Sequence, residues 1–259
     1  MLAALLLATA AGLSTSIGSV LGLVVKKPGP KFIGFTLGFS GGVMILVSFV
    51  ELLAEAIKIE GVGFFGAHIA FFIGMGLYML IDILVPHDYI GQHDHPESRE
   101  PDEIVHSNRT LERTGLMVAL GIGLHNFPEG MATFVGALED IHLGIAIAIA
   151  IAIHNIPEGL AISAPIYAAT GNRRKAFLWS FLSGVTEIAG AGLAALVLLP
   201  ILNDLVMGYV LAGVAGIMVA ISLDELIPVA KMYDTEHTPI VGVIVGMIVM
   251  ALSLWLLAE

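Results

Sequence analysis

Two short motifs in this chain place an imidazole, an amide and a carboxylate at the same spacing. Residues 125–130 read His-Asn-Phe-Pro-Glu-Gly, and residues 154–159, 29 positions later, read His-Asn-Ile-Pro-Glu-Gly. In a helix, residues four apart lie one turn apart on one face, so each histidine should stack with its own glutamate. Both motifs lie inside long apolar segments, where ionisable side chains mark functional sites by default. We expect the two His/Glu pairs to bind one ion together. These four residues are His125, Glu129, His154 and Glu158.

Each motif also contains a proline, which has no N–H to donate within a helix. Pro128 therefore leaves the carbonyl of Leu124 without its helical partner, and Pro157 does the same to Ile153. We expect each helix to be kinked, with free carbonyl oxygens beside the His/Glu pair. Loosened backbone at membrane depth is tolerated only where it is buried in protein or lines a wet cavity.

The composition is that of an all-α integral membrane protein. The 259 residues are 57% hydrophobic and 13% charged, with a mean hydropathy of +0.94, which is typical of a chain surrounded by lipid. The net charge is −11, and the sequence has no basic patch that would bind phosphates, so no nucleic acid is expected as a partner. Cysteine is absent, so a metal site must use histidine, carboxylate, amide, carbonyl or methionine donors.

Eight apolar runs are long enough to span a bilayer, and they use nearly the whole chain. We expect one transmembrane domain over residues 1–259, with a His-containing loop over residues 86–114. Ala8-Thr9-Ala10 resembles a signal-peptidase site, but no basic segment precedes it, so the first run is predicted to be a membrane helix. The predicted spans are 2–25, 32–57, 63–85, 116–138, 143–170, 176–202, 205–230 and 238–258.

The basic residues predict how the chain is oriented in the cell (inner) membrane. Ten of the 11 Lys and Arg residues lie in the first, third, fifth and seventh connections, and Lys58 alone lies on the other side. By the positive-inside rule these four connections face the cytoplasm, and both termini face out. The composition of residues 86–114 predicts a disordered, solvated loop. A weak metal-collecting or sensing role and no role are both open for it.

An internal repeat relates the second and seventh spans. Gly42-Val43-Met44 matches Gly216-Ile217-Met218, and residues 48–53 match residues 222–227 at the same offset. Since these spans cross in opposite directions, the match indicates the inverted repeat of many secondary transporters, whose sites lie near the midplane. The alternative is that membrane helices rich in small residues resemble one another because such residues allow close packing.

Six acidic residues lie well inside the predicted spans, and every Lys and Arg lies in a connection or at a helix end. Facing lipid, each acid would cost about 3 kcal/mol, so all six must face inward and find a counter-charge in protons or metal ions. Imidazole and carboxylate together suit Zn²⁺ and its first-row neighbours better than Ca²⁺ or Mg²⁺. Met44 could add a thioether, although a mid-membrane methionine more often packs. The acids are Glu51, Glu129, Glu158, Glu187, Asp224 and Glu225.

The doubled His-Asn-x-Pro-Glu-Gly motif on adjacent spans, the eight spans and the His-bearing third connection resemble the ZIP family of divalent-metal transporters. The bacterial branch of broad-range zinc uptake proteins is most similar, and the resemblance covers the whole chain. It implies uptake of Zn²⁺, or of related ions such as Cd²⁺, Fe²⁺ and Mn²⁺, into the cytoplasm. It also implies a centre between the fourth and fifth spans that holds two ions.

Matched position by position, the resemblance implies ligands for both ions. The first ion would be held by Met44, His125, Glu129 and Glu158. The second would be held by Asn126, Glu129, Asn155, Glu158 and Glu187, so that Glu129 and Glu158 bridge the two ions. His154 occupies a position that the family often gives to a ligand or to its hydrogen-bond partner.

Three departures from the family pattern leave parts of the pathway open. Asn155 stands where some relatives have Asp, Asp224 stands where some have His, and Ile188 replaces a common Pro. The charge of the second site and the chemistry of the inner exit are therefore undecided. The residues expected along the transport pathway are Ser48, Glu51, Asp224, Glu225 and His237.

Two rival functions use the same residues. An intramembrane metal-dependent hydrolase would also combine a metal with buried carboxylates, but the chain has no His-Glu-x-x-His sequence, and its acids follow helices as a path would. A metal exporter is the second rival, because the motif does not fix the direction of transport. The sequence leaves a monomer and a homodimer equally open.

Overall fold

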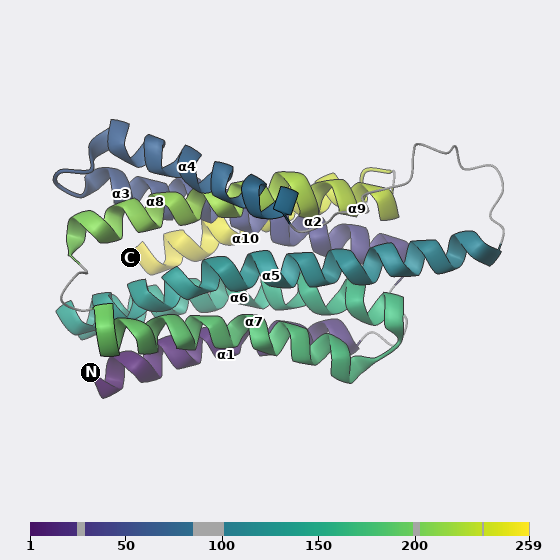
Figure 1. The fold of residues 1–259 in the computed structure, drawn as a ribbon, viewed down its shortest axis with the longest axis horizontal. Helices are drawn as coiled ribbons and strands as arrows, with labels where there is room; N and C mark the ends of the chain where they lie inside the picture. The colour runs from purple at the N-terminus through teal and green to yellow at the C-terminus, as the bar shows by residue number, and fades with distance from the viewer. Residues whose placement is uncertain (25–28, 85–100, 199–202, 235, 259) are drawn as a thin grey trace.

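Long helices lie side by side in the computed structural model, with both chain termini at the same end (Figure 1). The structure describes residues 1–24, 29–84, 101–198, 203–234 and 236–258, and every regular element within these ranges is helical. The elements are α1 (Leu2–Val24), α2 (Pro30–Val47), η1 (Ser48–Leu52), α3 (Leu53–Lys58), α4 (Gly63–Leu84), α5 (Pro101–Glu139), α6 (Ile141–Thr170), α7 (Arg173–Leu193), η2 (Ala194–Leu198), α8 (Asp204–Ile221), η3 (Ser222–Leu226), α9 (Ile227–Tyr233) and α10 (Thr238–Ala258).

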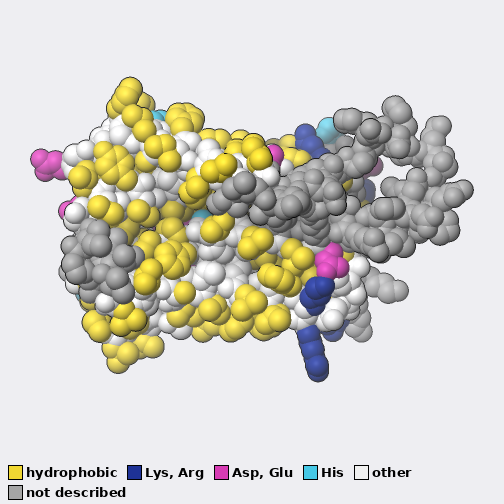
Figure 2. All heavy atoms as spheres, in the orientation of Figure 1, with side chains coloured by type: hydrophobic (Ala, Val, Ile, Leu, Met, Phe, Trp, Pro, Cys, Tyr) yellow, Lys and Arg dark blue, Asp and Glu magenta, His cyan; other side chains and the backbone are white. Residues whose placement is uncertain are grey.

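The predicted all-α membrane fold is confirmed. Within the described ranges, 7 helical segments are long and apolar enough to cross a membrane. The remaining predicted span, the fourth at residues 116–138, lies inside α5. The flanks of the bundle expose large apolar side chains such as Phe65 and Leu196, and the face in Figure 2 is largely hydrophobic, with Lys and Arg toward one end. Such a surface suits contact with lipid.

The loop predicted over residues 86–114 is shorter than expected. Helix α5 begins at Pro101, so residues 101–114 are helical rather than disordered. Proline favours the first position of a helix, because its missing N–H would have no helical partner there and its φ angle already suits the helix. Residues 86–100, with His87, His93 and His95, lie outside the described residues.

The helices form two groups that meet along one seam. In the first group, α1 packs against α5, α6 and α7, while α5 packs against α6 and α7. In the second group, α2 packs on α10 and α4 packs on α8. These groups occupy the lower and upper halves of Figure 1. The seam is formed mainly where α2 meets α6 and where α5 meets α8.

The two segments matched by the internal repeat have the same backbone. Both α2 and α8 continue into a five-residue π-helix, η1 and η3, and then into a short α-helix, α3 and α9. The serine that opens each π-helix bonds to the carbonyl four residues earlier: Ser48 Oγ donates to Met44 at 2.6 Å, and Ser222 Oγ donates to Met218 at 2.8 Å. The matched segments thus share their local irregularity, as an inverted repeat predicts, and α7 also continues into a five-residue π-helix, η2.

Candidate metal centre

The two motifs lie on α5 and α6, which pack against each other, and both helices continue through their prolines, Pro128 and Pro157. The glycine that ends each motif faces a neighbouring helix at very short range. A Cβ on Gly130 would lie 1.9 Å from the Glu187 carbonyl oxygen of α7, and one on Gly159 would lie 1.9 Å from the Thr15 carbonyl oxygen of α1. Glycine is therefore required at both positions, because it lets α7 and α1 close around the motifs.

The histidines pair across the helices rather than along them. His125 Nε2 lies 2.9 Å from Glu158 Oε1, and His154 Nε2 lies 3.2 Å from Glu129 Oε1. The expected stacking of each histidine on the glutamate of its own helix is thus replaced by two reciprocal bridges between α5 and α6. Spacing along one helix defines a shared face, but the helix that packs on this face supplies the hydrogen-bond partner.

Each bridge leaves donor atoms unused inside the protein. All four side chains are buried, and the Nδ1 atoms of His125 and His154 and the Oε2 atoms of Glu129 and Glu158 have no hydrogen-bond partner in the described structure. Buried polar atoms without partners are costly. In the described structure, Lys and Arg form ion pairs only near helix ends, where Lys31 pairs with Glu236, Lys58 with Glu55 and Lys175 with Glu112. The centre therefore gathers unused nitrogen and oxygen donors that have no Lys or Arg partner in the described structure, as a cation site requires.

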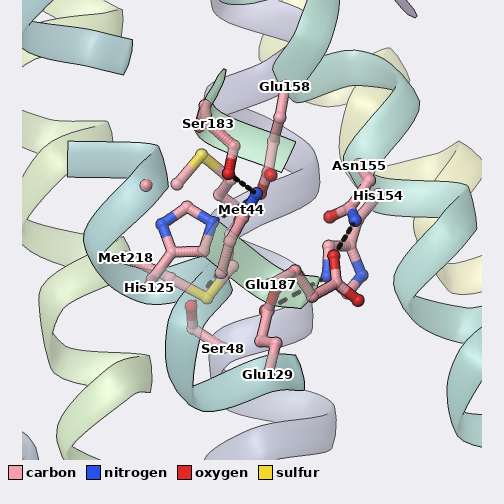
Figure 3. Close-up of polar contacts among 12 residues, drawn as sticks. Met44, Ser48, His125, Glu129, His154, Asn155, Glu158, Ser183, Glu187 and Met218 are labelled. Atoms are coloured by element: carbon pink, nitrogen blue, oxygen red, sulfur yellow. Dashed lines mark hydrogen bonds and ion pairs between the residues drawn. The ribbon is translucent and has the colours of Figure 1, made fainter. Parts of the chain in front are cut away.

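Helix α7 brings a third carboxylate to the same place. Glu187 is buried, and its Oε2 accepts a hydrogen bond from Asn155 Nδ2 at 2.7 Å, whereas its Oε1 has no partner in the described structure. The amide of Asn126 donates to the Ser183 carbonyl of α7 at 3.2 Å. Glu187 and both asparagines thus join the two His–Glu bridges, as Figure 3 shows for Asn155 and Glu187.

The second group of helices faces this centre with a methionine and a carboxylate. Met44 and Ser48 are fully buried, and both appear beside the bridges in Figure 3. Glu51 of η1 is half-buried, and its Oε2 is buried without a partner in the described structure. Met44, Ser48 and Glu51 thus extend the centre along α2 and η1.

Met218 was not among the predicted ligands. It is fully buried, it belongs to the same close-up as His125 and Met44, and it is the repeat counterpart of Met44. The match of Gly42-Val43-Met44 with Gly216-Ile217-Met218 in the sequence already pairs Met218 with Met44. Treating Met44 as a ligand position should have placed Met218 on the opposite side of the same centre.

The other residues expected along the pathway lie on η3 and just before α10. Asp224 accepts a hydrogen bond from Tyr78 of α4 at 3.5 Å, and Glu225 is buried on the same π-helix, η3. His237 is exposed just before α10. Within the described ranges, no three His, Asp or Glu side chains converge closely enough to hold an ion already. Binding an ion at the centre would require the His–Glu bridges to open and present their atoms to it.

Comparison with known proteins identifies relatives that cover nearly the whole chain. A family described as "ZIP Zinc transporter" matches residues 85–254. The zinc transporter ZupT of Oceanobacillus iheyensis is 49% identical, covering 100% of this chain and 99% of that protein. The zinc transporter ZupT of Campylobacter jejuni is 46% identical over 99% and 97% of the two chains. That of Escherichia coli O127:H6 is 44% identical over 98% and 96%.

Proposed function

This chain belongs to the ZIP family of zinc transporters, and from this premise we propose that it takes Zn²⁺ up into the cytoplasm through the centre between α5 and α6. Cd²⁺, Fe²⁺ and Mn²⁺ are further candidate substrates, since nitrogen and carboxylate donors accept several first-row metals. The proposed orientation in the cell membrane places both termini outside, as the distribution of Lys and Arg predicts.

One observation carries the proposal. Four buried His and Glu side chains form two bridges that leave two nitrogens and two oxygens without partners in the described structure. A site that only stabilised the fold would be expected to satisfy these atoms, because each buried polar atom without a partner costs free energy. Buried ion pairs are also weak evidence for stabilisation, since replacing them by apolar side chains is often neutral or stabilising. Unused donors at the centre of a membrane bundle are better explained by a cation that visits and leaves.

We propose that two ions share the bridging carboxylates Glu129 and Glu158. The first ion would take His125 and Met44 as well, and the second would take Asn126, Asn155 and Glu187. The buried placement of all these residues around the α5–α6 contact supports the assignment. The second ion then has three carboxylates and two neutral amides, which is an oxygen-rich shell.

We infer that access changes at the seam between the two groups of helices. Within the first group, backbone meets backbone at Gly130 and Gly159, so its helices should move together. Across the seam, a Cβ on Gly121 of α5 would meet side-chain atoms of Ile221 of α8. Side chains can change rotamer and slide where tightly packed backbone cannot.

A flux measurement tests the proposed function. Purified protein in liposomes should give saturable Zn²⁺ entry, and an orientation-controlled preparation should show faster entry from the side that carries the termini. A panel of Zn²⁺, Cd²⁺, Fe²⁺ and Mn²⁺ then ranks the substrates. Faster flux toward the terminal side would instead support an exporter, and hydrolysis of a lipid or peptide with metal retained would support an enzyme.

A labelling experiment tests the path on either side of the centre. Glu51 lies seven residues beyond Met44, or about 10 Å along the helix toward the outer face, and Glu225 is its repeat counterpart on a helix that runs inward. The natural chain has no cysteine, so Glu51→Cys and Glu225→Cys each carry a single thiol. An impermeant thiol reagent outside should label position 51, with protection by added Zn²⁺, and should spare position 225.

Inside-out vesicles provide the control for this experiment, because they should reverse the pattern. Equal labelling of both positions from one side would exclude separate outer and inner access and favour a continuous open channel.

A further inference from the structure

The centre consists of two halves that a fixed shift in numbering interconverts. Adding 29 turns His125 into His154 and Glu129 into Glu158. The same exchange turns the His125–Glu158 bridge into the His154–Glu129 bridge. Their Nε2-to-Oε1 distances are similar, 2.9 Å and 3.2 Å. The ligands on α5 and α6 are therefore related by an approximate two-fold axis between these helices.

The same relationship extends to the helices that flank the motifs. Gly130 meets the Glu187 carbonyl of α7, and its counterpart Gly159 meets the Thr15 carbonyl of α1, each with a Cβ-to-oxygen distance of 1.9 Å. Glu187 and Thr15, which are 172 positions apart, thus occupy equivalent places on α7 and α1.

The asparagine amides give the same offset independently. Asn126 Nδ2 donates to the Ser183 carbonyl of α7 at 3.2 Å, and Asn155 Nδ2 donates to the Ala11 carbonyl of α1 at 3.1 Å. Ser183 and Ala11 are again 172 positions apart. Two different kinds of contact therefore agree that α1 is the counterpart of α7.

The symmetry is broken at one chemically important position. Glu187 puts a carboxylate beside Asn155, and its counterpart Thr15 puts only a hydroxyl on the other side. Thr15 is 0% exposed, and its Oγ1 and the Oδ1 of Asn126 have no hydrogen-bond partner in the described structure.

The surroundings of these two side chains are alike. A Cβ on Gly12 would lie 3.2 Å from the Glu187 Cβ, and a Cβ on Gly184 would lie 3.2 Å from the Thr15 Cβ. Gly12 and Gly184 are themselves 172 positions apart. A longer side chain at position 15 thus has the same neighbouring glycine that accommodates Glu187.

The proposed ligands of the second ion determine where Thr15 lies relative to it. Four of them, Asn126, Glu129, Asn155 and Glu158, are interchanged by the shift of 29, so an ion that binds all four lies on or near the two-fold axis. Glu187 approaches this ion from α7. Its counterpart on α1 must then approach the same ion from the opposite side.

We propose that Thr15 completes the shell of the second ion through a bridging water that its hydroxyl holds beside Asn126. The proposal rests on the two-ion centre of the proposed function and adds a residue to it. Because Thr15 is neutral, the shell has three carboxylates rather than four. Cation affinity rises with the number of charged ligands, so Thr15 sets this affinity low enough for the divalent ion to leave.

Exchanging the two residues provides the test, with Zn²⁺ binding to purified protein measured by calorimetry. The wild-type chain should bind two ions, and Glu187→Thr should lose the second binding step while keeping the first. The double variant Thr15→Glu/Glu187→Thr should regain the second step to within about tenfold, because the carboxylate has only changed sides. Its matched control, Thr15→Gln/Glu187→Thr, has the length without the charge and should not regain it.

Single variants keep the proposal testable if the exchanged protein does not fold. Thr15→Val keeps the shape of threonine, and it should weaken the second step by about 10- to 100-fold. Thr15→Glu alone should tighten the second step and lower the maximal rate of transport. A folded exchange variant that binds one ion, or an unchanged second step in Thr15→Val, would overturn the role of Thr15 and leave the proposed transport intact. A wild-type chain that binds no Zn²⁺ would overturn both.

Discussion

Replacing either bridging carboxylate, by Glu129→Gln or Glu158→Gln, should abolish saturable Zn²⁺ uptake while leaving the protein folded. Glutamine keeps the volume and the ability to bond the facing histidine, but it removes a charge that both ions would share. Loss of a partner outside the ligand shell typically costs about 10- to 100-fold in affinity or activity, so loss of a bridging ligand should cost more. Initial rates of Zn²⁺ entry into liposomes measure the effect.

Thermal unfolding of the same variants separates function from folding. Both carboxylates are buried, and removing one charged partner of a buried pair is destabilising. Because glutamine can still hydrogen-bond the facing histidine, the apparent melting temperature should fall somewhat, but both variants should still unfold cooperatively. Glu55→Gln is the matched control, because Glu55 is exposed and pairs only with Lys58 among the described residues. Wild-type uptake in either motif variant would contradict the proposed centre.

Residue types and spacing predicted a group of buried His and Glu side chains, and the structure brings these side chains together between α5 and α6. The duplicated motif predicts a cation site there, because buried His and Glu without nearby Lys or Arg favour a bound cation. Glu187 is predicted by its charge, because a carboxylate inside a membrane span requires a partner. The repeat between residues 48–53 and 222–227 predicted two related segments, and both contain the same π-helix.

Contacts between helices could not be predicted in the same way. Periodicity indicates the face on which His125 lies, but the packing of α5 on α6 gives it Glu158 as a partner instead of Glu129. Thr15 was missed because an uncharged residue inside an apolar helix gives no signal by itself. Its equivalence to Glu187 becomes visible only through contacts between helices, at Gly130 and Gly159 and at the asparagine amides.

The second large effect is expected at these glycines. Gly130→Ala and Gly159→Ala should each destabilise the first group of helices, because the new methyl group would lie 1.9 Å from a carbonyl oxygen of the neighbouring helix. The helices must separate to relieve this clash, and overpacking of this kind costs about 1–3 kcal/mol. For a chain of this length the apparent melting temperature should fall by roughly 2–12 °C, and metal binding should weaken because each glycine directly follows Glu129 or Glu158.

Gly192→Ala is the matched control for this prediction. Gly192 is also helical, on α7, and a Cβ there would meet no atom within 4 Å. Alanine is favoured over glycine in a helix by roughly 0.5–1 kcal/mol, so this variant should melt at the same temperature as wild type or higher. The same substitution is thus expected to have opposite signs at the two kinds of site. A melting temperature of Gly159→Ala equal to that of Gly192→Ala would show that α1 and α6 do not meet as closely as described, and would remove one of the two kinds of contact that make Thr15 the counterpart of Glu187.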